Sequence, residues 1–226
     1  MNLGIIGITG KMGRKILEAA KNDPDLHVVF GLASENSSDL DSSIFSRERA
    51  PFEKVDILID FSVATATAQN IEKAMQYKKP ILIGTTGILP EVKELLNTAK
   101  KEIPILISSN FSLGIHLLKK ALRVLSKELK DVSTQIIETH HINKKDAPSG
   151  TALDLKAAIG NPNTAIKSIR KDDVSGEHTV IFHMEGEEII LTHKACNRDL
   201  FALGALRAAK LLKNQPPGLY TLEDLM

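Results

Sequence analysis

The sequence has few of the features that mark secreted or membrane proteins. Only one of its 226 residues, Cys196, is a cysteine, so no disulfide can form within the chain and a reducing compartment is expected. No apolar run approaches the length of a membrane span, and no charged N-terminal region precedes an apolar one. These absences predict a cytoplasmic protein that does not enter a membrane.

Strong charge of either sign is also missing. The formal net charge is +1, from 29 Lys and Arg against 28 Asp and Glu, and no basic tract occurs. A chain without a concentrated positive patch is a poor ligand for nucleic acid or anionic lipid, so we expect neither partner. With 42% hydrophobic residues, the composition supports a buried core in one large domain or two small ones.

The first half of the chain alternates short apolar runs with amphipathic segments. This order predicts βαβ units and therefore an α/β fold with a Rossmann-like parallel sheet. The polar segment 35–53 has weak periodicity and is predicted to be irregular, with at most one short helix. The predicted strands are 3–7, 26–33, 55–61, 80–84 and 103–108, and the predicted helices are 12–21, 63–77 and 90–101.

Three glycines, Gly7, Gly10 and Gly13, lie where the first predicted strand passes into the first predicted helix. They form a G-x-x-G-x-x-G pattern in which Thr9 occupies the second glycine position of the dinucleotide fingerprint. At a strand-to-helix turn, backbone N–H groups can face a pyrophosphate, although a plain tight turn is the alternative. The predicted cofactor contacts of this loop are Gly7, Ile8, Thr9, Gly10, Lys11, Met12 and Gly13.

Polar segments also follow the second, fourth and fifth predicted strands. Ligands of open α/β sheets bind at the carboxyl ends of the strands, and the ribose-binding position falls about 20 residues past the glycine loop. The run Gly84 to Gly87 could equally be a simple β-to-α turn. The further predicted cofactor contacts are Ser34, Glu35, Gly84, Thr85, Thr86, Ser108, Ser109, Asn110 and Phe111.

Two adjacent histidines, two adjacent lysines and one aspartate occur together in the segment ETHHINKKDAPSGT, 138–151. It joins a predicted strand, 132–138, to a predicted helix that begins near Pro148 or Ser149 and runs to 159. The N–H groups at a helix start favour an anion, and Lys144 adds positive charge. His140 changes its protonation near neutral pH. The segment therefore predicts a pocket for a carboxylate or phosphate with a proton donor at its edge.

Simpler explanations exist for the same residues. Ser-Gly-Thr before a helix is often only a cap, and a Lys-Lys pair is often solvated. A metal site is not expected, because His140 and His141 are neighbours on a strand and point to opposite faces. In addition, no third ligand stands at a typical metal-binding spacing.

The segment from Glu138 to Ala152 resembles the signature of the 4-hydroxy-tetrahydrodipicolinate reductase family, E-x-H-H-x-x-K-x-D-A-P-S-G-T-A, at every fixed position. The glycine loop, Gly84-Thr85-Thr86-Gly87 and Ser108 to Phe111 are similar to three further segments of that family. The resemblance covers nearly the whole chain. It implies reduction of 4-hydroxy-tetrahydrodipicolinate, a dicarboxylate of the diaminopimelate–lysine pathway, by NADPH or NADH.

The resemblance also implies roles for individual residues. His140 and Lys144 would be the catalytic proton-donor candidates. Ser34 aligns with the family's acidic ribose ligand, and because a serine replaces the acid, the choice between NADH and NADPH stays open. Ser34 together with Lys11, which could reach a 2′-phosphate, favours acceptance of NADPH and leaves dual use open. The residues implied in holding the substrate carboxylates are His141, Lys144, Ser149, Gly150 and Thr151.

The second half of the chain predicts a smaller α+β domain. A long amphipathic helix, 113–129, is followed by the signature segment and by strands 166–171, 178–184 and 187–195, the last two as a hairpin. By resemblance, the final helix, 199–213, packs on the first domain, and the protein is a homotetramer. The predicted domains are 1–111 with 199–226 for the dinucleotide, and 112–198 for substrate binding and oligomerisation.

Histidines outside the signature are predicted to be structural, namely His116, His178, His183 and His193. Two other functions remain open at this point. One is a different Rossmann oxidoreductase, such as a relative of homoserine or aspartate dehydrogenase, and the other is a nucleotide sensor without catalysis. The presence of both His140 and Lys144 argues against a sensor.

Overall fold

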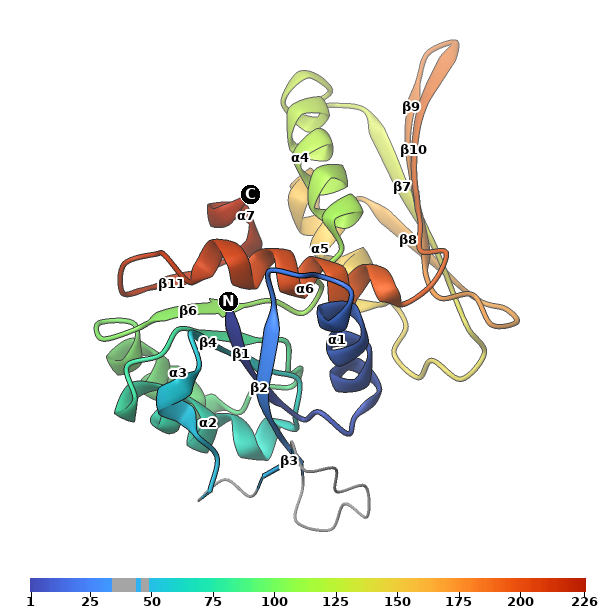
Figure 1. The fold of residues 1–226 in the computed structure, drawn as a ribbon. Helices are drawn as coiled ribbons and strands as arrows, with labels where there is room; N and C mark the ends of the chain where they lie inside the picture. The colour runs from blue at the N-terminus through green and yellow to red at the C-terminus, as the bar shows by residue number, and fades with distance from the viewer. Residues whose placement is uncertain (34–43, 46–48) are drawn as a thin grey trace. The chain divides into compact units, whose positions relative to one another are not determined.

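The computed structural model describes residues 1–33, 44–45 and 49–226. This part of the chain divides into two compact units (Figure 1). Unit 1 consists of Met1–Phe111 and Phe201–Met226, and unit 2 consists of Ser112–Leu200. The dinucleotide and substrate roles of the two predicted domains stay predictions at this stage.

Unit 1 is built on a parallel sheet with the order β11-β6-β5-β4-β1-β2-β3. Its central strands are short and apolar, as expected for strands covered on both faces. From β1 the chain first adds β2 and β3 on one side of the sheet and then β4, β5 and β6 on the other side. Folds of this kind bind ligands at the point between β1 and β4 where the strand order changes side. The strands are β1 Asn2–Ile6, β2 His27–Leu32, β3 Ile44–Phe45, β4 Ile57–Asp60, β5 Ile81–Ile83, β6 Pro104–Ile107 and β11 Gly218–Tyr220.

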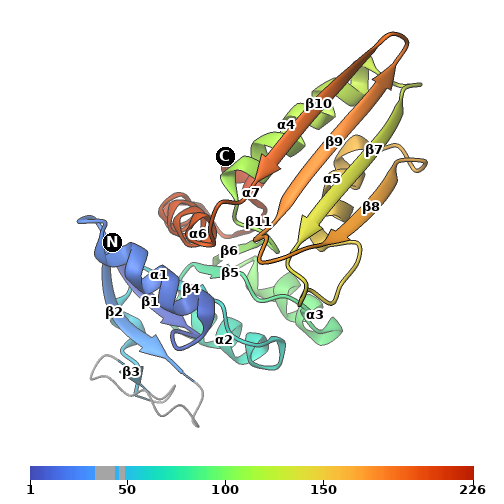
Figure 2. The same cartoon turned by 90° about the vertical axis from the view of Figure 1, so that its right-hand side faces the viewer.

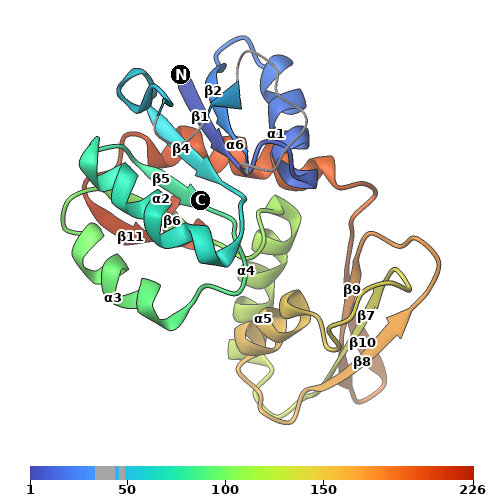
Figure 3. The same cartoon turned by 90° about the horizontal axis from the view of Figure 1, so that it is seen from below.

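Helices cover both faces of this sheet (Figure 3). One buried cluster includes Ile16 of α1 and Ala205 of α6, and a second, on the opposite face, includes Ile71 of α2 and Leu96 of α3. The predicted Rossmann-like α/β architecture is therefore confirmed. The helical elements are α1 Lys11–Lys21, η1 Phe52–Lys54, α2 Ala64–Gln76, α3 Pro90–Ala99, α6 Asp199–Leu212 and α7 Leu222–Leu225.

Unit 2 is a four-stranded mixed sheet with two helices on one face. The strand order is β10-β9-β7-β8, with β7 parallel to β8 and antiparallel to β9. Figure 2 shows α4 and α5 behind the strands, with the other face of the sheet towards the viewer. The elements are α4 Leu113–Glu128, β7 Ser133–His140, α5 Gly150–Ile159, β8 Ala165–Arg170, β9 Glu177–Met184 and β10 Glu187–Lys194.

Two strands differ from the prediction. The strand expected to end at Glu138 continues as β7 to His140, so His140 lies on a strand and not in a loop. The expected C-terminal turn contains β11, which pairs with β6 at the edge of the sheet; three residues beside Pro217 were too few to show a strand pattern. Most of segment 35–53 lies outside the described residues. Among the described helices, none is long and apolar enough to cross a membrane.

Candidate functional site

The glycine loop of unit 1 connects β1 to α1 with backbone packed against backbone. Gly7 has φ +81°, and a Cβ atom there would lie 2.6 Å from the carbonyl oxygen of Phe61. A Cβ on Gly13 would lie 2.2 Å from the carbonyl oxygen of Gly7. Larger residues at these two positions would push the loop away from the sheet, so the glycines let α1 begin close to the end of β1.

The start of α1 lacks a side-chain cap. Its N-cap is Gly10, which has no side chain to accept a hydrogen bond, and no acidic residue stands in the first turn. The N–H groups at a helix start carry partial positive charge and need an acceptor. An anionic group such as a pyrophosphate would satisfy them. The local structure therefore fits the phosphate part of a dinucleotide.

The predicted cofactor contacts around this loop are exposed to different degrees. Gly10 and Lys11 are exposed, while Gly7, Thr9 and Met12 are half-buried. Ile8 is 3% exposed, and its side chain packs where a Cβ on Gly31 would stand. Only the backbone of Ile8 can therefore reach a ligand. The predicted contacts Ser34 and Glu35 lie outside the described residues.

The ends of β4 and β5 are joined by a buried polar network. Asp60, fully buried, accepts hydrogen bonds from the N–H of Ser62 at 2.9 Å, the amide of Asn70 at 2.9 Å and the hydroxyl of Thr85 at 3.4 Å. This network holds Thr85 beneath the surface, while Thr86 is exposed. Of the predicted pair, Thr86 is the side chain that a ligand can reach.

The segment after β6 forms a turn held by its own side chains. The hydroxyl of Ser108 donates to the carbonyl oxygen of Asn110 at 2.7 Å and accepts from the N–H of Asn110 at 3.2 Å. Phe111 is buried, with its ring 5.5 Å from that of Phe61. Ser109 is exposed, Gly84 is half-buried, and a Cβ on Gly84 would lie 2.3 Å from the ring of Phe61.

In unit 2, the start of α5 is capped by Ser149. Its hydroxyl oxygen accepts from the N–H of Ala152 at 3.2 Å, and the residue is 1% exposed. The side chain of Ser149 is thus committed to its own helix, which limits its predicted role in substrate binding to the backbone. Gly150 is exposed and Thr151 is half-buried, so these two residues form the accessible part of the helix start.

His140 is buried beside a fully buried carboxylate. Its Nδ1 atom hydrogen-bonds to Oε2 of Glu138, two residues earlier on the same face of β7. Burial lowers the pKa of His140, and the hydrogen bond to Glu138 raises it; the net direction is a lowered pKa. Glu138 itself is part of the signature segment, but no role was predicted for it.

Lys144 lies in the loop between β7 and α5. Its Nζ atom is 2.8 Å from Oδ1 of Asp146, and about a quarter of its side chain is exposed. The hydrogen bond from Lys144 holds the pKa of Asp146 below its usual range. The amine is therefore held near the surface of the loop by one carboxylate, with further donor hydrogens left for a ligand.

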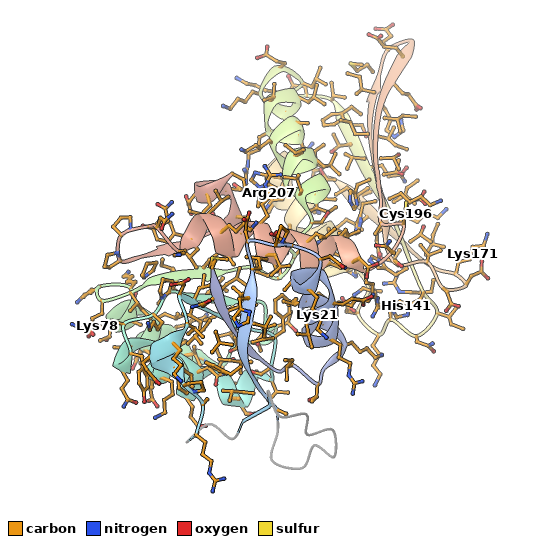
Figure 4. All side chains as sticks on the ribbon, in the orientation of Figure 1. Lys21, Lys78, His141, Lys171, Cys196 and Arg207 are labelled. Carbon is orange, nitrogen blue, oxygen red and sulfur yellow. The ribbon has the colours of Figure 1, made fainter. Side chains whose placement is uncertain are left out.

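His141 follows β7 directly and contacts an arginine that was not predicted. Its Nε2 atom lies 3.2 Å from Nη2 of Arg198, and because a guanidinium only donates, Nε2 accepts. His141, Lys171 and Cys196 follow the ends of β7, β8 and β10 at one end of the sheet (Figure 4). The signature loop therefore belongs to that end of unit 2.

Comparison with known proteins identifies the family of this chain. Residues 1–111 match the family described as "Dihydrodipicolinate reductase, N-terminus", and residues 114–226 match "Dihydrodipicolinate reductase, C-terminus". The chain belongs to the dihydrodipicolinate reductase family. The resemblance drawn from the signature segment is confirmed, and with it the assignment to the NAD(P)H-dependent oxidoreductases.

Relatives within this family match the chain over its full length. A 4-hydroxy-tetrahydrodipicolinate reductase of Caldanaerobacter subterraneus subsp. tengcongensis is 38% identical, covering 100% of this chain and 98% of the relative. That of Thermosipho africanus is 36% identical, with 100% and 98% covered. The solved dipicolinate-bound dihydrodipicolinate reductase of Paenisporosarcina sp. TG-14 has a TM-score of 0.84 at 23% identity, covering 100% of this chain and 99% of that one, and shows the same fold.

The signature segment identified the family, but it does not include His178, which the structure places beside the candidate site. This residue of β9 was predicted to be structural, yet its Nε2 atom lies 3.3 Å from the hydroxyl of Ser149 and its ring lies 5.1 Å from that of His140. Burial and the charge of His140 lower its pKa to about 4. His178 is therefore neutral at pH 7. No local pattern in the sequence could reveal these contacts, because they join distant segments.

Within the described residues, Glu138, His140 and His178 have ligand atoms close enough together to hold a metal ion. The arrangement is already explained by hydrogen bonds. The Glu138 carboxylate accepts from Arg170 at 2.9 Å and from His140, and His178 contacts Ser149. A guanidinium in direct contact with the carboxylate disfavours a second cation there. The chemistry of the donor set thus fits a hydrogen-bond network better than a metal centre.

Proposed function

We propose that this chain catalyses the reaction named for its full-length relatives, the reduction of 4-hydroxy-tetrahydrodipicolinate to tetrahydrodipicolinate in diaminopimelate and L-lysine biosynthesis. The family match over both units carries this proposal. Dipicolinate, bound in the solved relative, is a ring with two carboxylates. It supports a cyclic dicarboxylate as the substrate of this chain as well.

Unit 1 would hold the cofactor, NADPH or NADH. The uncapped start of α1 would bind the pyrophosphate through backbone N–H groups. Exposed Lys11 stands beside that start and would attract the 2′-phosphate of NADPH. When bound, the reduced nicotinamide supplies a hydride. The segment from Ser108 to Phe111 and exposed Thr86 would contact the nicotinamide side.

Unit 2 would hold the substrate and supply a proton. The start of α5, at Gly150 and Thr151, would bind one carboxylate, with His141 and Lys144 as further donors. The substrate would lose its 4-hydroxyl group as water, which leaves a conjugated imine. Such an imine accepts hydride most readily when the negative charge that develops meets a fixed cation. Lys144 and His140 would stabilise this charge and deliver the ring proton.

A pair of lysine variants tests the proposal. Lys144→Met should lower kcat by about 10²- to 10⁴-fold, the usual contribution of a positioned acid or base, with an unchanged Kd for NADPH. Lys145→Met is the matched control, because Lys145 is the exposed neighbour and should keep wild-type turnover. Turnover is followed by NADPH and NADH oxidation with freshly made substrate.

The possible outcomes separate the competing functions. Nucleotide oxidation that depends on this substrate supports the reductase. Oxidation with another carbonyl or imine, but none with this substrate, would indicate a different Rossmann oxidoreductase. Tight nucleotide binding without oxidation of any substrate would indicate a sensor. Wild-type turnover in Lys144→Met would remove Lys144 from the mechanism.

We further propose a cytoplasmic homotetramer that assembles through the face of the unit 2 sheet opposite α4 and α5. Ile137 and Ile181 alternate with the buried positions of β7 and β9, and Ile190, which pairs with Ile181, is 57% exposed. Thr179 and Thr192 hydrogen-bond across the same face at 3.0 Å. Isoleucines on a sheet face that α4 and α5 leave uncovered favour association. Light scattering of the purified protein measures the mass, and a monomer would contradict the proposal.

A further inference from the structure

A carboxylate that is fully buried needs strong partners, and Glu138 has three. Its Oε1 atom accepts from Nη2 of Arg170 at 2.9 Å, its Oε2 atom contacts Nδ1 of His140, and Ser168 hydrogen-bonds to it as well. Burial raises the pKa of Glu138, but these hydrogen bonds hold it below its usual range. The carboxylate is therefore charged at neutral pH, at a position with no access to solvent.

We propose that Glu138, held by Arg170, is a positioning residue for both proton donors, fixing the tautomer of His140 and the loop that carries Lys144. This inference rests on the proposed function, in which His140 and Lys144 act on the substrate. Glu138 itself is buried beneath them and does not touch the substrate. Its effect is transmitted through His140 and Arg170.

The effect on His140 follows from hydrogen-bond chemistry. An ionised carboxylate only accepts, so Nδ1 of His140 must carry a hydrogen and Nε2 becomes the reactive nitrogen. Gly176 leaves space beside that atom, because a Cβ there would lie 3.2 Å from Nε2. With φ +153°, Gly176 also has a backbone conformation that L side chains rarely adopt. The nitrogen that faces away from Glu138 is thus kept open.

The charged and titratable groups around His140 act in opposite directions. Burial lowers the pKa of His140, as do the charges of Lys144 and Arg170, whereas Glu138 raises it; the net direction is a lowered pKa. The ring of His178 packs edge-on against that of His140 from β9, and it is neutral at pH 7 because its pKa is about 4. Glu138 is therefore the negative charge in contact with His140 that favours its protonated form.

The effect on the Lys144 loop runs through one guanidinium. Nε of Arg170 donates to the carbonyl oxygen of Lys144 at 3.3 Å, and Nη2 donates to that of Asp146 at 2.5 Å. The same Nη2 atom holds Glu138. Arg170 thereby ties β8 to the backbone on both sides of Lys145, and this fixes the start of the Lys144 side chain.

Glu138→Gln separates the two possible tautomers while preserving the shape of the side chain. Arg170 offers only donors, so the amide oxygen of the glutamine should face Arg170 and its NH₂ group should face Nδ1 of His140. Nδ1 would then accept, and the hydrogen would move to Nε2. Both nitrogens donate in the protonated ring, so this contact would also disfavour protonation.

Nitrogen NMR shifts of His140, assigned by comparison with His140→Gln, report the tautomer directly. We expect hydrogen on Nδ1 in the wild type and on Nε2 in Glu138→Gln. Turnover should fall by about 10²-fold, and the limb of the kcat profile that falls as His140 loses its proton should move to lower pH. The Kd for NADPH should not change, and Glu138→Asp should restore the wild-type tautomer and part of the turnover.

Glu188→Gln is the matched control, because Glu188 pairs with Nδ1 of His183 at 2.6 Å on the exposed part of the same sheet. This variant should keep the wild-type kcat profile. An unchanged tautomer and pH limb in a folded Glu138→Gln protein would overturn the inference. If that variant does not fold, hydrogen on Nε2 of His140 in the wild type would overturn it, and hydrogen on Nδ1 would support it.

The experiment distinguishes this inference from the proposed function. If His140→Gln keeps full turnover, His140 is not the proton donor of the proposed reaction, whatever its tautomer. If His140→Gln loses turnover and Glu138→Gln does not, the proposed donor stands and Glu138 is only structural. Arg170→Lys keeps the positive charge, but a lysine cannot contact Glu138 and the carbonyl oxygens of Lys144 and Asp146 at the same time. The variant should therefore loosen the Lys144 loop, lower kcat and raise KM for the substrate.

Discussion

Adding one methyl group at Gly13 tests whether close backbone packing, rather than glycine flexibility, shapes the nucleotide loop. The Cβ of Gly13→Ala would lie 2.2 Å from the carbonyl oxygen of Gly7 and 2.6 Å from Cα of Ile8, against 3.4 Å for ordinary contact. Both neighbours are backbone, so α1 must move by roughly 1 Å. We expect overpacking to cost about 1–3 kcal/mol of stability, which lowers Tm by about 2–4 °C per kcal/mol for a chain of this size.

The same displacement should weaken nucleotide binding more than it weakens the fold. A shift of about 1 Å in a positioning group can cost on the order of 10²-fold, so we expect the Kd for NADPH to rise by up to that factor. Fluorescence titration of the nucleotide and calorimetric melting measure the two effects separately. Wild-type affinity in Gly13→Ala would refute the view that the first turn of α1 binds the pyrophosphate.

Gly160→Ala provides a matched control for a general loss of stability. Gly160 is the C-cap of α5 in unit 2, with φ +74°, and a Cβ added there would have no atom within 4 Å. Alanine there is strained by its backbone conformation, at a cost of about 1 kcal/mol, but it displaces no neighbour. Its Tm should fall while its Kd for NADPH stays unchanged.

Two further predictions concern His178 and the cap of α1. The pKa of His178 is about 4 in the folded protein against 6.5, so the unfolded chain binds more protons between these values and stability rises with pH across this window, by up to about 3 kcal/mol. Urea unfolding of His178→Gln should show a free energy of unfolding that changes less with pH across this window. His183, exposed on the same strand, is the control, and His183→Gln should keep the wild-type pH dependence. A wild-type pH dependence in His178→Gln would contradict the prediction. Gly10→Asp should supply the missing cap of α1 and preserve Tm, but its carboxylate should repel the phosphates of NADPH and raise the Kd. Gly10→Ser also supplies a cap but is uncharged, so it should raise the Kd less. Equal Kd values for NADPH in these two variants would contradict an anion site at the start of α1.

Elements with a strong local pattern were predictable from the sequence. The glycine loop and the helix that follows it were located because strand, glycine turn and helix succeed one another within a few residues. The strand β11 was not, since Gly218–Tyr220 offers only three residues and is stabilised by pairing with β6. Tertiary context decided that element, and no periodicity can reveal it.

The candidate site could be predicted only as far as its members are neighbours in sequence. His140, Lys144 and the start of α5 lie within one segment. The Arg170 contact to Glu138 joins β8 to β7, and the His178 contact to Ser149 joins β9 to the start of α5. Such pairs depend on strand register, which the sequence of one chain does not specify before the sheet is known.

The cap of α5 shows how local and functional demands compete. Ser149 was expected both to cap the helix and to hold a carboxylate. Its hydroxyl accepts from Ala152 and contacts His178, because a buried hydroxyl must satisfy its own hydrogen bonds first. Under the proposed function, direct substrate contacts from this helix start would therefore fall to Gly150 and Thr151.

The two-segment construction of unit 1 has a consequence for biosynthesis. A Cβ on Gly204 would lie 1.8 Å from the carbonyl oxygen of Phe111, so the chain leaves unit 1 and returns to it at adjoining points. On the ribosome, residues 1–111 emerge long before α6 and β11 can cover their sheet. Unit 2 can then acquire its structure while unit 1 is still incomplete, because residues 201–226 can complete unit 1 only after unit 2 has been synthesised.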